Sequence, residues 1–154
     1  MIKKFILVLA VMICALSLSI TASAEMKRFK HFQADVPKGW TAIEKPSPDD
    51  PSASLVELRK GQGKQAPSLD LTVKYSKDGN AKKQIEFLRD LYGAKSFKKV
   101  KYGDGGYAHQ RPDGNNSSML TGFCHIGNSV TISFRSQGGD QKEAEGFLKT
   151  LKKL

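Results

Sequence analysis

The chain has 154 residues and carries 25 lysine and arginine residues against 15 aspartate and glutamate residues, which gives a net charge of +10. This length predicts one domain with a sizeable core. The positive charge indicates anionic surroundings, namely a membrane surface, an acidic protein or a polyanion, although plain solubility accounts for it equally well.

The N-terminus has the pattern of an export signal. A short basic start precedes an almost wholly apolar stretch, residues 5–18, and small side chains at residues 22–24 precede the charged Glu25. A translocon binds an apolar helix, and a signal peptidase accepts small side chains at its cleavage site. We therefore predict that residues 1–24 are a cleaved signal peptide and that residues 25–154 are a single domain, periplasmic or secreted, in a bacterium.

Two alternatives to cleavage remain. An uncleaved membrane anchor needs about 20 apolar residues, and the apolar stretch is shorter than that. Lipidation at Cys14 is disfavoured because bulky Ile13 stands where a lipoprotein signal has a small residue. Cleavage leaves no transmembrane segment. It also lowers the net charge from +10 to +8 by removing two lysines, and it leaves Cys124 without a partner for an internal disulfide.

The first half of the remaining sequence alternates between apolar and polar residues, as half-buried strands do. Residues 32–36 and residues 40–45 are predicted to be the two strands of one hairpin, joined by a turn at residues 37–39. Residues 69–75 alternate most strictly and predict a further strand. The polar face of that strand would carry Asp70, Thr72 and Lys74.

The spacing of apolar residues then changes to three and four, which predicts helices. Residues 81–92 predict a helix with Asn80 as its N-cap and Gly93 as the residue that ends it. The stripe expected to pack on the sheet is Ile85, Leu88, Leu91 and Tyr92. A last helix is predicted after Asp140, which lies three residues before Glu143 in the spacing of a capping box. Its stripe is Ala144, Phe147, Leu148, Leu151 and Leu154, and it would dock on the sheet as a terminal lid.

Glycine-containing turns predict two more hairpins, one between residues 97–102 and residues 107–110 and one around Gly127 and Asn128. The order of elements is therefore strands, helix, strands, helix. Because hairpins place neighbouring strands antiparallel, the predicted fold class is α+β, a mostly antiparallel sheet built from hairpins with two main helices packed on it.

The neighbours Cys124 and His125 raise the question of a catalytic or metal-binding pair. The predicted two-residue turn would pair Cys124 with Thr131 on the polar face and His125 with Val130 among apolar side chains. Adjacent residues of a strand point to opposite faces, so no dyad or chelating pair can form between these two. We predict no catalytic residue, no metal site and no cofactor, since the histidines have no zinc spacing and no glycine-rich segment has a phosphate-loop ending.

Three sets of residues are candidates for binding. The first basic group is Lys95, Lys98, Lys99 and Lys101; the second is Lys27, Arg28 and Lys30; the polar sheet face would show Lys74, Cys124, Thr131 and Arg135. Protection of an edge strand against aggregation explains the first group about as well as binding does. Nucleic acid is not expected as a partner, because an exported protein rarely meets it.

The opening F-Q-A-D-V-P-K-G-W at residues 32–40, with the order of elements up to the last helix, resembles the PsbP-like superfamily, which includes the bacterial DcrB-like exported proteins. The resemblance covers nearly all of residues 25–154. It implies an antiparallel sheet with helices packed on its faces. It also implies mostly non-enzymatic roles as accessory or binding proteins, with no catalytic residue set to carry over.

These observations together predict a small exported, non-enzymatic binding or accessory protein with a basic surface. The expected partner is an acidic protein or an anionic envelope surface. Two alternatives remain open: a thiol-dependent enzyme or redox protein that uses Cys124, and an envelope- or lipid-associated structural protein.

Overall fold

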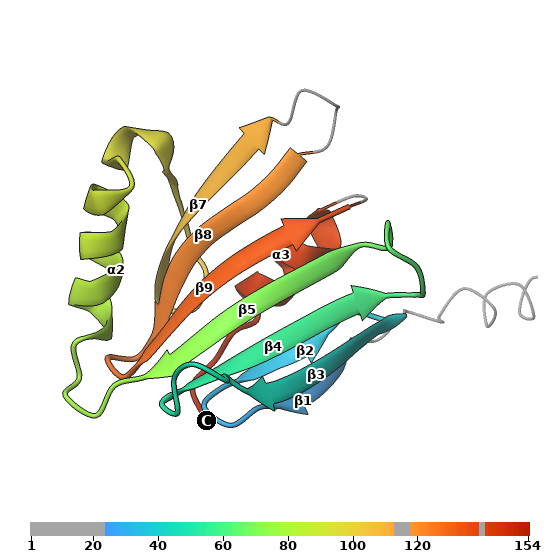
Figure 1. Cartoon of the computed structure of the whole chain (residues 1–154), viewed down its shortest axis with the longest axis horizontal. Coiled ribbons are helices and arrows are strands. Elements are labelled where there is room, and N and C mark those ends of the chain that lie inside the picture. Colours follow the sequence, from blue (N-terminus) through green and yellow to red (C-terminus); the bar gives the residue numbers. More distant parts are fainter. Residues whose placement is uncertain (1–23, 113–117, 139–140) are drawn as a thin grey trace, which may run out of the picture.

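The computed structural model describes residues 24–112, 118–138 and 141–154. Seven strands form one antiparallel sheet in the spatial order β3-β4-β5-β9-β8-β7-β6 (Figure 1). Their bounds are Trp40–Pro46 for β3, Ala53–Lys60 for β4, Ser68–Tyr75 for β5, Lys98–Val100 for β6, Gly105–Pro112 for β7, Ser118–Ile126 for β8 and Val130–Gln137 for β9. A separate hairpin consists of β1 (Glu25–Arg28) and β2 (Gln33–Val36), and the helices are α2 (Ala81–Leu91) and α3 (Lys142–Lys149). The predicted α+β class with an antiparallel sheet and two helices is confirmed.

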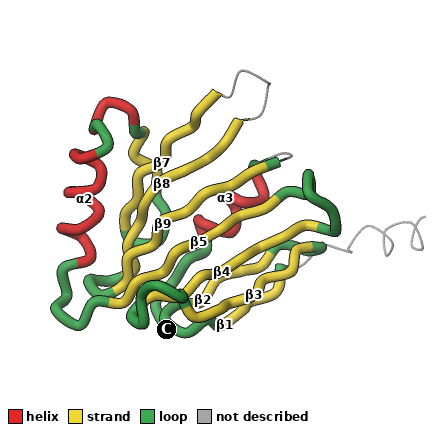
Figure 2. Tube along the Cα trace, in the orientation of Figure 1, coloured by secondary structure: helices red, strands yellow, loops and turns green. Residues whose placement is uncertain are grey.

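The two faces of the sheet are covered differently (Figures 1 and 2). The β1-β2 hairpin and α3 lie on one face and enclose the hydrophobic core against it. Phe29 and Phe32 of the hairpin stack with their ring centroids 4.5 Å apart, and Phe147 of α3 meets Phe29 edge-on at 6.3 Å. On the other face α2 packs against β7, β8 and β9. No helix among the described residues covers β3 and β4 on that face.

The predicted hairpin between residues 32–36 and residues 40–45 is wrong. β2 pairs with β1, and β3 pairs with β4. The β1-β2 hairpin is closed by the Phe29 N–H, which donates to the Phe32 carbonyl at 2.8 Å, and both rings are buried. Gly39, at a φ of 81°, then carries the chain from this layer into the sheet. Alternation revealed both strands, but it does not specify which strand pairs with which.

Helix α2 covers nearly the predicted residues, but its start is satisfied differently. The Asn80 side chain does not cap the helix; its Oδ1 accepts hydrogen bonds from Ser76 Oγ and Gln84 Nε2. The Ala81 N–H instead donates to the Asn128 carbonyl of the β8-β9 turn at 3.0 Å. The Asn128 carbonyl, which is distant in sequence, therefore accepts a hydrogen bond at the start of the helix where the Asn80 side chain was expected to do so. This bond joins the start of α2 to the sheet.

Helix α3 ends earlier than predicted, at Lys149, and the expected cap Asp140 lies outside the described residues. Lys152 pairs its backbone with Gln33 of β2 in both directions, at 2.9 and 3.0 Å, so these groups are not available for further helical bonds. Leu151 is still buried, whereas Leu154 is 45% exposed and does not extend the packed stripe. Docking against the hairpin thus limits the helix.

The predicted register of the last hairpin is wrong by one residue. The turn contains three residues, 127–129, and Ile126 pairs with Val130. Cys124 therefore pairs with Ile132 on the core face, and His125 pairs with Thr131 on the polar face. The Asp104 carboxylate accepts a hydrogen bond from the Gly127 N–H, and neighbouring carbonyls of the turn bind the chain that leads into α2. A one-residue shift exchanges the two faces of a strand, so the expected placement of Cys124 on the polar face is also wrong.

Candidate functional site

A groove of about 790 Å³ lies between β6, the segment just before it, and α3. Its floor includes the core residues Tyr102, Ala108 and Leu120. Five lysines line it: Lys95, Lys98, Lys99, Lys101 and Lys149. Residues of the whole first predicted group therefore line one groove, and α3 adds Lys149. The ammonium of Lys99, however, lies over the Tyr107 ring on the opposite side of the sheet.

The short strand β6 distributes its lysines to both sides of the sheet. Lys98 pairs with Ala108, whose side chain is buried on the α3 side, whereas Lys99 pairs with Tyr107. The Lys99 ammonium lies 5.7 Å from the centroid of the Tyr107 ring, a cation–π contact on the α2 side. Because β6 is also the last strand of the sheet, its lysines fit the alternative role of edge protection as well.

The charge around the groove is almost uncompensated. Glu145 is the carboxylate among its lining residues, and its Oε2 lies 4.0 Å from Lys149 Nζ. Within the described part of the chain, the exposed side chains of Lys95, Lys98 and Lys101 form no ion pair with a carboxylate. The rim therefore presents a positive potential that an anionic group would lower.

The floor of the groove is apolar, and the Tyr102 phenol in it is uncharged. Tyr102 is buried, with its ring 5.4 Å from Phe134 in an edge-on contact. Burial is the main cause that raises the pKa of Tyr102 to about 12, and the nearby Glu145 carboxylate adds to it. The phenol is therefore neutral at physiological pH. A ligand in this groove would meet cations at the rim and apolar surface beneath them.

The second predicted basic group lies at the other edge of the sheet. The Lys27 ammonium donates a hydrogen bond to the carbonyl of Ala42 on β3. The backbone N–H of Lys30 donates to the Glu44 carboxylate at 2.9 Å. Arg28 pairs with Gln33 in the β1-β2 hairpin. Since β3 and β6 are the two ends of the strand order, the two basic groups do not form one surface.

Cys124 and His125 point to opposite faces, as predicted. The Cys124 side chain is fully buried, and this burial, assisted by the Asp104 carboxylate, raises the pKa of the thiol far above its ordinary value. His125 Nδ1 lies 2.7 Å from the carbonyl oxygen of Gly127. Within the described ranges, no group of three or more histidine, cysteine, aspartate or glutamate side chains is placed to hold a metal ion.

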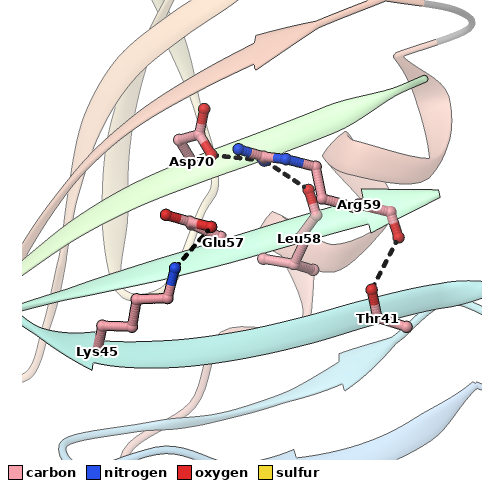
Figure 3. A network of polar contacts seen from close by, with 6 residues as sticks. All are labelled: Thr41, Lys45, Glu57, Leu58, Arg59 and Asp70. Carbon is pink, nitrogen blue, oxygen red and sulfur yellow. Dashed lines mark hydrogen bonds and ion pairs between the residues drawn. The ribbon is translucent and has the colours of Figure 1, made fainter. Parts of the chain in front are cut away.

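The polar sheet face carries Lys74, Thr131 and Arg135 of the predicted set. Most of its charges are paired with one another. Arg59 Nη1 lies 2.6 Å from Asp70 Oδ1, and Lys45 Nζ lies 3.3 Å from Glu57 Oε2 (Figure 3). Lys74 Nζ lies 3.0 Å from Asp50 Oδ2. Exposed pairs of this kind contribute about 0–1 kcal/mol each to stability. They also leave this face with less free positive charge than the groove, so the groove is the stronger candidate for binding an anion.

Sequence reasoning missed Lys149, Glu145 and Tyr102 as parts of the site. Lys149 and Glu145 belong to the last helix, and Tyr102 lies two residues after the end of β6. Their place at the groove depends on how α3 docks across the sheet, for which the sequence holds no local signal.

No helix in the described residues is long and apolar enough to cross a membrane. No protein-family model matches the chain, and no curated protein matches it. A crystal structure from Bacteroides thetaiotaomicron VPI-5482, at 1.50 Å resolution, is similar in fold, with a TM-score of 0.57 and 15% sequence identity. The match covers 88% of this chain and 49% of that one, so this chain spans about half the length of that protein. At this identity the likeness extends to the fold alone.

Proposed function

We propose that this protein is an exported, non-enzymatic binding or accessory module with a PsbP-like fold, and that it holds an acidic segment of a partner protein in the groove beside β6. The observation that carries the proposal is the convergence of Lys95, Lys98 and Lys101, with Lys149, around an apolar floor. Export, to the periplasm or the exterior, rests on the signal pattern of residues 1–24.

Electrostatics and burial both favour an acidic protein segment as the ligand. Lysines are compact charges on flexible stems and tolerate carboxylates in varied positions. The half-buried side chains of Phe97 and Val100, which also line the groove, would contact an apolar side chain next to those carboxylates. Long-range attraction between opposite charges raises association rates and weakens as salt increases.

Thiol chemistry at Cys124 stays outside the proposal. A nucleophilic or redox-active cysteine needs access to its substrate and a pKa low enough to form the thiolate. The Cys124 side chain is fully buried, and its pKa is raised rather than lowered.

The direct test is binding of a fluorescent acidic peptide, decaglutamate extended by one leucine, measured by anisotropy at low and high salt. Two charge reversals at the rim, Lys98→Glu and Lys101→Glu, should weaken binding by about tenfold or more, because one pair of charges about 4 Å apart is worth about 1 kcal/mol in water. The matched control reverses Lys64 and Lys77, two exposed lysines that do not line the groove.

Equal weakening by the control pair would reduce the effect to net charge and contradict a specific groove. Binding that does not respond to salt would contradict the electrostatic mechanism. Partner capture from a periplasmic extract, with the same two pairs of variants, then identifies the natural ligand.

A further inference from the structure

Helix α2 exposes apolar side chains that an amphipathic helix would ordinarily bury. Phe87 is 65% exposed, Leu91 is 63% exposed and Tyr92, directly after the helix, is 62% exposed. Only Ala81 and Ile85 of α2 are buried against the sheet. Phe87 and Leu91 are four residues apart and therefore neighbours on one side of the helix. Helix α2 forms one end of the molecule (Figure 1), and the high exposure of Phe87 and Leu91 shows that this side faces away from the sheet.

The exposed residues continue into an aromatic cleft of about 350 Å³ at the end of α2. Tyr92 stacks on Phe123 with the ring centroids 5.7 Å apart, and Phe97 lies at the same distance from Phe123. Met119 also lines this cleft. The apolar side of α2 and the aromatic cleft thus form a connected surface, here named the α2 patch.

The segment that carries the α2 patch is rich in positive charge. Residues 82–101 contain the cations Lys82, Lys83, Arg89, Lys95, Lys98, Lys99 and Lys101. The acids of this segment are Glu86 and Asp90, and both form ion pairs with Arg89. Across the described residues the six lysines have no carboxylate partner within ion-pair distance. Lys83 lies one helical turn before Phe87 and so next to it on the helix surface.

We propose that the α2 patch docks this protein on the surface of an anionic lipid bilayer. Lysines gain from anionic headgroups, phenylalanine and leucine gain from the acyl region, and tyrosine prefers the boundary between the two. This inference goes beyond the groove beside β6, because it uses the outer side of α2 and requires no acidic partner protein.

Two other occupants fit the surface less well. A second copy of the chain would bring the same uncompensated lysines toward one another, and like charges across an interface repel. A partner helix needs a groove, whereas Phe87 and Leu91 project from a convex helix surface. A bilayer accepts projecting side chains because it is planar and deformable.

The test measures co-sedimentation of the chain from Glu25 onward, which keeps every residue of the core, with vesicles. Vesicles of phosphatidylglycerol and phosphatidylcholine are compared with vesicles of phosphatidylcholine alone. Replacing Phe87 and Leu91 together by Gln should lower the partition coefficient by about tenfold or more. Full insertion of one such side chain into the apolar region of the bilayer already raises that coefficient by about tenfold. The control Ile43→Gln removes an apolar residue that is 53% exposed on β3, far along the sheet from α2, and should change nothing.

Charge is tested separately by Lys83→Gln, which should lower partitioning by about fivefold, against the control Lys64→Gln. Circular dichroism confirms that each variant is folded. The Phe87 and Leu91 double variant should bind the acidic peptide as the parent chain does, which keeps this test distinct from that of the groove. Equal binding to neutral and anionic vesicles, or unchanged binding by the double variant, would overturn the proposal. Self-association of the parent chain that the double variant abolishes would assign the patch to a second copy instead.

Discussion

Burial decides the chemistry of individual residues in this protein, and Cys124 shows it most clearly. Its side chain is fully enclosed on the core face, opposite Ile132 and away from His125. A thiol in that position behaves as a small apolar group, because the charged thiolate would lose its hydration. The lysines of the groove are exposed instead. Exposure thus distinguishes the candidate binding residues from those that only pack in the core.

We predict that Cys124 does not react with iodoacetamide in the folded chain from Glu25 onward and reacts readily in urea, since the thiolate is the reactive form. Cys124→Ser should lower the free energy of unfolding by about 1–3 kcal/mol, because a hydroxyl without a partner would be buried there. Urea denaturation followed by far-ultraviolet circular dichroism measures this difference. Rapid alkylation of the native protein would show that the site opens to solvent.

Close backbone packing makes Gly122 a sensitive position. A Cβ atom at this residue would lie 2.0 Å from the Tyr107 carbonyl oxygen and 2.6 Å from Cζ of Phe134. Gly122→Ala should therefore destabilise the fold by about 1–3 kcal/mol through overpacking. The matched change Gly146→Ala has open space in α3 and should stabilise by about 0.5–1 kcal/mol through helix propensity. Equal effects of the two changes in thermal unfolding would contradict the packing of β7 against β8 and β9.

At the scale of elements, local patterns determined which segments form strands and helices but not how they pair. Strict alternation identified β5, and three-to-four spacing identified α2 nearly to the residue. The partner of β2 and the end of α3 depend on burial of Phe29 and Phe32 and on the Gln33–Lys152 backbone pair, which join distant parts of the chain. Neither has a local signal, so these predictions failed.

The same argument explains the one-residue error in the β8-β9 turn. Two-residue turns are favoured in isolated hairpins, but here Asp104 binds Gly127 and the Asn128 carbonyl receives the first N–H of α2. These contacts hold a three-residue turn. Tertiary contacts thereby decided which face Cys124 joins, which the sequence could not specify.

Asp50 provides an element-scale test at the β3-β4 connection. Its carboxylate accepts hydrogen bonds from the Ser52 hydroxyl at 2.6 Å and the Ser52 N–H at 2.9 Å, and Lys74 of β5 lies 3.0 Å away. These contacts lower the pKa of Asp50 to about 2. The hydrogen bond from the Ser52 hydroxyl has the largest effect, and the contact with Lys74 comes second.

Since the pKa of an unfolded aspartate is about 3.9, the stabilisation from Asp50 is fully present above that pH and is lost as the pH falls toward about 2. Asp50→Asn should therefore flatten the decline of thermal stability in this range. A parallel decline in the variant and the parent chain, measured by calorimetry, would mean that other carboxylates account for it.

Across the whole molecule, the sheet separates the candidate binding surfaces. The groove lies between β6 and α3, the α2 patch lies at one end, and the paired charges of the polar face lie over β3, β4 and β5. The run of lysines from Lys95 to Lys101 was visible in the sequence because the residues are close along the chain. Its separation from Lys27 and Arg28, and its meeting with Lys149, follow from the strand order and the docking of α3.

The most direct measurement of the central claim is chemical-shift mapping by nuclear magnetic resonance, in which the acidic peptide is titrated into the isotope-labelled chain. If the groove is the binding site, the largest shifts occur at the amides of Val100, Tyr102, Ala108 and Leu120, with Lys149 on α3. Largest shifts at the β1 and β3 edge, around Lys27 and Arg28, or shifts of similar size over all exposed lysines, would contradict it.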